Sequence, residues 1–149
     1  MVTIKNNHKA LTLPELMVSA VIFLIAVVAI LYSYLKCLEL ADIGRNVNIA
    51  TQAVRNEIED IKNTSFANVF ATYNNVTFVA NGINGRGVVY VDNSNSNLLQ
   101  IKVVFCWKQS NGRLFGEDAN LNGALDAGED KNANGQLDSY AQITTSIYG

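Results

Sequence analysis

Oxygen-bearing side chains alternate along residues 118–129, a segment of twelve residues. Positions 1, 3, 5 and 9 carry carboxylates or amides, position 6 is a glycine that permits a sharp turn, and position 12 is a glutamate. With the main-chain carbonyl of position 7, they form a set of oxygen ligands whose number and order suit Ca²⁺. We therefore predict calcium as a cofactor. The candidate ligands are Asp118, Asn120, Asn122, Ala124 through its carbonyl, Asp126 and Glu129.

A second copy of this pattern follows without a spacer and repeats the first nine positions. Its candidate ligands are Asp130, Asn132, Asn134, Gln136 through its carbonyl, and Asp138. The twelfth position of the second loop is Ala141, so this loop has no closing carboxylate of its own. We predict that it binds calcium more weakly than the first loop, unless it shares a carboxylate of the first loop.

The alternative is a surface turn, because Asn, Asp and Gly dominate turns for reasons unrelated to metals. A chance turn need not repeat with a period of twelve or place a leucine at position 8 twice, as Leu125 and Leu137 do here. Residues 117–138 also hold six acidic side chains against Lys131 alone, a self-repelling cluster that a divalent cation would neutralise. We therefore expect calcium to hold residues 117–139 in shape. The tandem loops resemble EF-hand loops and, since no helices separate them, thrombospondin type 3 repeats more closely.

Glu15 is a second chemically informative residue, because it lies at the start of the only long apolar run of the chain. Residues 16–35 are twenty mainly apolar residues, which is long enough to cross a bilayer. A charge within such a segment is costly, by roughly 2.5 to 3.5 kcal/mol for Asp on insertion scales, and it indicates a functional residue by default. The alternative is an ordinary anchor whose first turn lies at the lipid headgroups.

The residues around Glu15 resemble the cleavage and methylation segment of type IV prepilins and of type II secretion pseudopilins. A short basic leader, MVTIKNNHKA, ends in a small residue, and five residues follow in the order that the family uses: Leu11, Thr12, Leu13, Pro14 and Glu15. The sequence departs from the family at Ala10, where glycine is normal. The resemblance implies that a prepilin peptidase cleaves between Ala10 and Leu11 and that Leu11 is then methylated.

The same resemblance implies a location and a set of partners. The leader lies in the cytoplasm, the apolar run crosses the bacterial inner membrane once, and the rest of the chain lies outside. An inner-membrane assembly platform then extracts the subunit into a filament of other pilin or pseudopilin subunits, either an extracellular pilus or a periplasmic pseudopilus. In that filament Glu15 pairs with the amino terminus of a neighbouring Leu11 and sets the register between subunits, since an unpaired charge there is strongly penalised.

The pattern of apolar residues predicts the elements that carry these sites. From Leu40 to Ile61 apolar residues recur every three or four positions, which indicates an amphipathic helix. We predict one helix from about Pro14 to about Lys62, with residues 11–35 in the membrane or filament core and residues 36–63 amphipathic.

After residue 63 the pattern changes to that of strands. Four segments are rich in β-branched and aromatic residues and are separated by Asn, Gly and Ser turns: 76–80, 86–92, 97–108 and 140–148. They predict an antiparallel meander within residues 64–149, and the apolar stripe of residues 40–61 is the only cover of sufficient size for one face. The predicted fold class is α+β and pilin-like, with a long N-terminal helix packed on a small antiparallel β-sheet.

The remaining sequence argues against catalysis and nucleic-acid binding. The only histidine, His8, leaves with the leader, and no phosphate-binding loop is present. Removing Lys5 and Lys9 with residues 1–10 changes the formal charge from −2 to −4, so no basic stripe remains. A disulfide between the two cysteines is less favoured than a buried thiol at Cys106. We expect the flanking aromatic residues, Phe105 and Trp107, to divide between the two faces of the sheet.

Together these patterns predict a structural subunit of a type IV pilus or type II secretion filament, stabilised by calcium. The strand of residues 97–108, its Asn-Gly-Arg turn and the closing strand of residues 140–148 favour a minor pilin or minor pseudopilin. The alternative is a monomeric, membrane-anchored calcium-binding module that presents its loops to a partner. Leader processing discriminates the two, because a mere anchor needs no cut after Ala10.

Overall fold

The computed structural model describes residues 12–149, so the predictions for Ala10 and Leu11 lie outside the described residues. The chain divides into two compact units, the first ending at Ala41 and the second covering Asp42–Gly149. Helix α1 (Leu13–Lys62) contributes to both units. Its bounds confirm the predicted long N-terminal helix to within one residue at its start.

In the first unit, α1 exposes large apolar side chains around its whole circumference. Phe23 and Leu35, for example, are 68% and 63% exposed. Among the described residues, α1 is the one helix that is long and apolar enough to cross a membrane, by length and composition. A helix that is apolar on all sides requires a lipid or protein environment around it.

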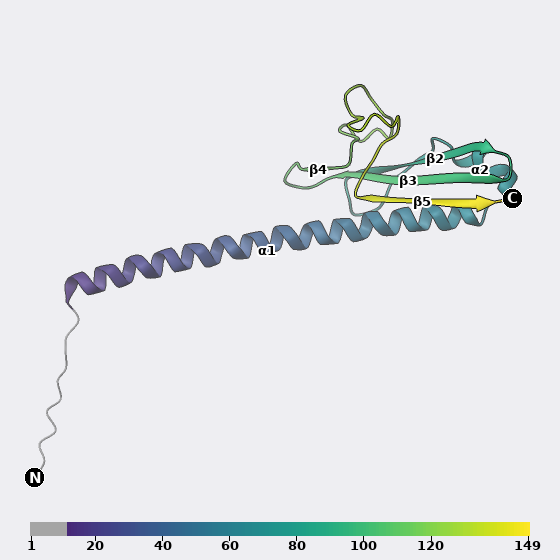
Figure 1. Ribbon diagram of the computed structural model, residues 1–149. Coiled ribbons are helices and arrows are strands. Elements are labelled where there is room, and N and C mark those ends of the chain that lie inside the picture. Colours follow the sequence, from purple (N-terminus) through teal and green to yellow (C-terminus); the bar gives the residue numbers. More distant parts are fainter. Residues whose placement is uncertain (1–11) are drawn as a thin grey trace, which may run out of the picture. The chain divides into compact units, whose positions relative to one another are not determined.

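The second unit contains a short helix, α2 (Phe66–Tyr73), and a five-stranded antiparallel sheet (Figure 1). The strands are β1 (Thr77–Phe78), β2 (Gly85–Asn95), β3 (Leu98–Lys108), β4 (Leu114–Phe115) and β5 (Ala141–Tyr148). The predicted meander is therefore confirmed in β1, β2, β3 and β5. Helix α2 and the two-residue strand β4 were not predicted.

Strand β3 is the centre of the sheet. It pairs with β2 along nearly its whole length, from Gly85 opposite Trp107 to Asp92 opposite Gln100. Strand β5 pairs with residues 98–105 of β3, and β4 pairs with Trp107 and Lys108. Since β2 already occupies one edge of β3, β4 and β5 share the other edge end to end. The chain between β4 and β5 therefore leaves the sheet and returns to the same edge.

One face of the sheet packs on the second half of α1. The buried stripe of the helix recurs at steps of three and four residues: Ala50, Val54, Ile58 and Ile61. It forms one apolar core with alternate residues of the strands, including Val89, Ile101, Val103, Phe105 and Trp107. Fully burying a single Val or Ile side chain contributes about 1.5 to 3 kcal/mol, so this interface is a main source of stability. It confirms the predicted cover of the sheet by the helix.

The opposite face of the sheet carries a smaller apolar cluster. It contains Val88, Val104, Cys106 and Leu137, with Leu121 and Leu125 packed against it. The three leucines come from the segment between β4 and β5, which therefore covers the second face. The expectation that Phe105 and Trp107 lie on different faces was wrong. Residues two apart in a strand point to the same side, so both lie in the helix-facing core while Cys106 faces away from it.

Candidate functional site

The predicted calcium loops form the connection between β4 and β5, above the outer face of the sheet (Figure 1). The leucine at position 8 of each loop anchors the connection to the sheet. Leu137 of the second loop is 1% exposed, and Leu125 of the first packs against the same cluster. The apolar position of the motif therefore has a structural role in both loops.

The first loop is organised around the carboxylate of Asp118, which is fully buried. Its Oδ1 accepts a hydrogen bond from the N–H of Asn122 at 3.1 Å, and its Oδ2 accepts one from the N–H of Gly123 at 2.7 Å. Gly123, at position 6, has a φ of 78°, a conformation that glycine adopts without strain. The loop thus bends around its first predicted ligand in the way that the sequence pattern requires.

The other predicted ligands of the first loop hydrogen-bond to one another and to the loop backbone. Oδ2 of Asp126 accepts hydrogen bonds from the amide Nδ2 atoms of Asn120, at 2.7 Å, and of Asn122, at 2.8 Å. The Glu129 carboxylate is 8% exposed and accepts the N–H groups of Ala119 and Asp126. The amide nitrogens of Asn120 and Asn122, rather than their oxygens, therefore face the Asp126 carboxylate.

The second loop repeats this arrangement bond for bond. Asp130 accepts the N–H groups of Asn134 at 3.1 Å and of Gly135 at 2.8 Å, and Gly135 has a φ of 75°. Oδ2 of Asp138 accepts hydrogen bonds from the amide Nδ2 atoms of Asn132, at 2.6 Å, and of Asn134, at 2.7 Å. Two segments of different sequence therefore fold into the same loop, as their shared motif predicts.

Asp138 differs from its counterpart Asp126 in having a cationic partner. Its Oδ1 lies 2.6 Å from the Nζ of Lys102, on strand β3. Burial acts to raise the pKa of Asp138, but hydrogen bonds from Lys102, Asn132 and Asn134, together with the charge of Lys102, hold this pKa below its ordinary value. The second loop is thus tied to the sheet by an ion pair.

The donor set of both loops consists of oxygen atoms, which is the chemistry of a hard cation such as Ca²⁺. Within residues 12–149, no three or more His, Cys, Asp or Glu side chains form a group that could hold a metal ion. Any cation in these loops therefore depends on amide and main-chain carbonyl oxygens as well as carboxylates. The predicted set, with its Asn side chains and the carbonyls of Ala124 and Gln136, has that composition.

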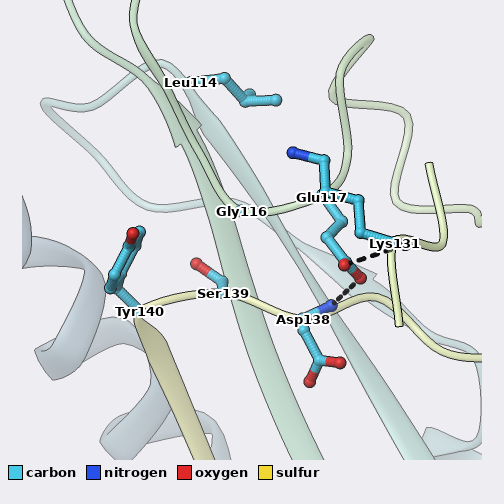
Figure 2. Close-up of a pocket in the computed structure, with 7 residues that line it drawn as sticks. All are labelled: Leu114, Gly116, Glu117, Lys131, Asp138, Ser139 and Tyr140. Carbon is cyan, nitrogen blue, oxygen red and sulfur yellow. Dashed lines mark hydrogen bonds between the residues drawn. The ribbon is translucent and has the colours of Figure 1, made fainter. Parts of the chain in front are cut away.

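Sequence reasoning missed Glu117, the residue before the first loop. It is 8% exposed and accepts two backbone N–H groups, those of Lys131 and Asp138 (Figure 2). The signal that could have found it is its spacing, because Glu117 lies twelve residues before Glu129, one period of the repeat.

At the other end of the chain, Glu15 caps the first turn of α1. Its Oε2 accepts the backbone N–H of Thr12 at 2.9 Å and the Thr12 hydroxyl at 2.7 Å. This is the glutamate half of a capping box, in which a residue of the first turn reaches back to an N–H that the helix leaves unpaired. The adjacent Pro14 is tolerated because residues of the first turn donate no helical hydrogen bond. The carboxylate is therefore already hydrogen-bonded within its own chain.

A family model described as the prokaryotic N-terminal methylation motif matches residues 5–31. The matched segment includes Ala10, Leu11 and Glu15 and continues into the exposed apolar half of α1. The chain is type IV pilin-like. No significant match was found among curated proteins or among solved structures.

For a pilin-like protein, the motif has direct consequences. It implies processing by a peptidase, assembly with other pilins and anchoring in a membrane by the apolar half of α1. The long N-terminal helix and the small antiparallel sheet are consistent with the pilin fold. Proteins with this motif have a structural rather than an enzymatic role.

The two cysteines of this pilin-like chain are both free, Cys37 exposed and Cys106 buried. Cys106 is 1% exposed within the cluster on the outer face of the sheet, and its burial raises the pKa of the thiol. A neutral thiol in that position serves as a small apolar side chain. The prediction of a core role for Cys106 is confirmed.

Proposed function

We propose that this pilin-like chain is a minor pilin or minor pseudopilin, a structural subunit of a type IV pilus or a type II secretion filament. One observation carries the proposal. The methylation motif of residues 5–31 leads directly into a helix whose apolar side chains are exposed on every side. Such a helix fits first a lipid bilayer and then the core of a filament made of similar helices.

The proposal includes an orientation. Residues 1–10 lie in the cytoplasm, residues 11–35 cross the inner membrane of a bacterium, and the second unit lies on the far side. After cleavage at Ala10 and methylation of Leu11, an assembly platform moves the subunit into a periplasmic pseudopilus or an extracellular pilus. The length and composition of α1 support a single span of this kind.

Glu15 is the proposed assembly residue. Its present partners are the N–H and hydroxyl of Thr12, both in its own chain. A carboxylate has further lone pairs, so it can accept the charged amino terminus of a neighbouring Leu11. In the low dielectric of a helical core, a pair of opposite charges is favoured strongly over a single unpaired charge.

We further propose that calcium binds the loop of Asp118 to Glu129 and stabilises the second unit. The support is the agreement between motif and backbone: the first aspartate organises each loop, glycine adopts a positive φ at position 6, and leucine packs at position 8. The loop holds the ends of β4 and β5 against the sheet. The role of calcium is then to keep a long connection in shape.

Filament incorporation of Glu15→Ala tests the proposed function. The variant should insert into the membrane and fold normally, yet be depleted at least several-fold from sheared filaments on an immunoblot. Glu59→Ala is the matched control, because Glu59 is an exposed glutamate on the second half of α1. Equal recovery of wild type and Glu15→Ala in filaments would contradict the pairing role. If neither is recovered, a monomeric, membrane-anchored calcium-binding module would be the better account.

A further inference from the structure

A groove of the second unit begins at Asp42, the residue with which that unit starts. The groove has a volume of about 450 Å³ and is lined by α1, by the turn before β2 and by the turn between β3 and β4. Pockets of about 300 to 1,000 Å³ hold small ligands in other proteins. Two cationic side chains, Arg45 and Lys108, are among the lining residues. The groove therefore has a size and a charge that suit an anion.

Neither cation of the groove is neutralised by a carboxylate of the second unit. One ion pair lies within residues 42–149, and it contains neither Arg45 nor Lys108. Both side chains are exposed, and Arg45 makes one long hydrogen bond, from Nη2 to the carbonyl oxygen of Gly82 at 3.4 Å. A guanidinium carries five N–H donors in a fork that fits two oxygens of a phosphate. Most donors of this guanidinium are therefore open to a ligand.

Among the described residues that line the groove, Asp42 is the only acidic one, and its carboxylate is bound to the turn between β3 and β4. Its Oδ2 accepts hydrogen bonds from the Nε2 of Gln109 and, at 3.2 Å, from the hydroxyl of Ser110. Oε1 of Gln109 accepts a hydrogen bond from the Nδ2 of Asn46 at 2.9 Å, and these two side chains are 4% and 8% exposed. A buried polar network whose members are paired is rigid. The groove is thus pre-formed, with two positive charges against one negative charge.

The charge around the groove is opposite in sign to that of the second unit as a whole. Residues 42–149 carry eight Lys or Arg and eleven Asp or Glu side chains, hence a formal charge of −3. Arg113 adds a third cation beside Arg45 and Lys108, because it closes the turn that lines the groove: its carbonyl oxygen accepts the N–H of Gln109 at 2.8 Å. A local positive charge on an acidic unit attracts anions that the rest of the surface repels.

The length of chain between the apolar run and the groove keeps the groove close to a bilayer. The apolar run ends at Leu35, and Asp42 lies seven residues later in the same helix. Seven helical residues rise about 10 Å, and even a fully extended chain of that length spans only about 25 Å. The headgroup region adds several ångströms to each side of the hydrocarbon core. A unit anchored by a span that ends at Leu35 therefore carries the groove within reach of lipid headgroups.

We propose that this groove binds the phosphate of an anionic phospholipid headgroup while the chain is anchored in a membrane. The inference rests on the proposed single span of α1 and adds a lipid partner to it. Arg45 donates paired hydrogen bonds to two phosphate oxygens, and Lys108 supplies a second positive charge. An anionic headgroup is favoured over a zwitterionic one, because the cation of a zwitterionic headgroup cancels the attraction of its phosphate.

This contact is electrostatic and belongs to the membrane-anchored state. Each basic side chain near an anionic membrane strengthens binding about fivefold, so Arg45 and Lys108 together contribute about thirtyfold. Both side chains are exposed, so salt screens the contact and binding weakens as the ionic strength rises. Extraction of the subunit from the bilayer into a filament removes the lipid and breaks the contact.

Titration of short-chain phosphatidylglycerol into the full chain, held in zwitterionic detergent micelles, tests the inference. Amide signals of Gly82 and Gly112 in NMR spectra report the groove, because both glycines line it. Both signals should shift at concentrations at which short-chain phosphatidylcholine and inorganic phosphate leave them unchanged. The double variant Arg45→Gln and Lys108→Gln should need about thirtyfold more phosphatidylglycerol. Arg55→Gln, at an exposed arginine elsewhere on α1, is the matched control and should respond as the wild type does.

An equal response to phosphatidylcholine or to inorganic phosphate would overturn the inference, and so would a wild-type response in the double variant. Depletion of the double variant from filaments without any lipid response in the wild type would assign the groove to a neighbouring subunit and overturn it as well. Flotation of the wild type with phosphatidylcholine vesicles tests the single span separately. A chain that does not float contradicts the span, whereas a chain that floats but shows no shift contradicts the lipid site alone.

Discussion

The substitution Asp118→Asn should remove most of the stabilisation that calcium gives to the second unit. Asp118 is fully buried, and its two oxygens organise the first loop through the N–H groups of Asn122 and Gly123. Asparagine has nearly the same volume but no charge, so the fold should persist while the affinity of the first site for a divalent cation falls.

The magnitude follows from ligand linkage. At free calcium of roughly ten times the dissociation constant of the first loop, that site adds about 1.4 kcal/mol to the free energy of unfolding. A domain of about a hundred residues changes its melting temperature by roughly 4 to 8 °C per kcal/mol. The wild type should therefore melt about 5 to 10 °C higher with calcium than with chelator, and Asp118→Asn should keep only a small part of this shift.

Circular dichroism melts of the full chain in micelles, recorded with calcium and with chelator, measure this difference directly. Only the calcium-dependent shift is compared, so any effect of the substitution on the calcium-free protein cancels. Asp60→Asn makes the same chemical change at an exposed position of α1 and should keep the full wild-type shift. Identical melting curves with calcium and with chelator in the wild type would show that the motif is only a turn.

Two further predictions concern the second unit without calcium. Val54→Ala, at a fully buried site of α1, should lower the free energy of unfolding by roughly 2 to 3 kcal/mol in a urea titration. Val79→Ala, at a 66% exposed site, is the control, and an equally small loss in the two variants would contradict the helix–sheet core. The pKa of Asp138 is lower in the folded state than in the unfolded chain. Ionised Asp138 therefore stabilises the fold fully above the ordinary carboxyl pKa of about 3.9. This stability is lost as the pH falls through the lower pKa of the folded state. Lys102→Met removes its charged partner, and unfolding measured from pH 6 to pH 2 should then show a smaller loss of stability in the variant than in wild type; an equal loss would refute the role of the ion pair.

The long elements could be predicted from the sequence because each repeats one period over many residues. Twenty apolar residues followed by the stripe of residues 40–61 define α1, and β-branched runs between Asn and Gly turns define β2, β3 and β5. Helix α2 could not be found in this way. Its eight residues, FANVFATY, include aromatic and β-branched types that also suit strands, and its Ser65 cap makes no side-chain hydrogen bond. Tertiary packing, with Val69 fully buried, supports this helix.

The turns of the two loops could be predicted from their motif, but the carboxylate that contacts the second loop could not. The motif counts forward from each first aspartate, and this count identifies Glu129 and reaches Ala141 in the second loop. The carboxylate that contacts the second loop is Glu117, which approaches it through the fold rather than through adjacent sequence. Lys102 likewise reaches Asp138 from a strand 36 residues away. Contacts of this kind depend on how β4 and β5 meet β3, which no local pattern specifies.

The most direct measurement of the central claim, that this chain is processed and assembled as a pilin, is the mass of its amino terminus after coexpression with a prepilin peptidase. The account predicts a chain that has lost residues 1–10 and begins at a methylated Leu11, with slower processing than in an Ala10→Gly variant. A chain that keeps its leader under conditions in which a control prepilin is fully cleaved would contradict the account.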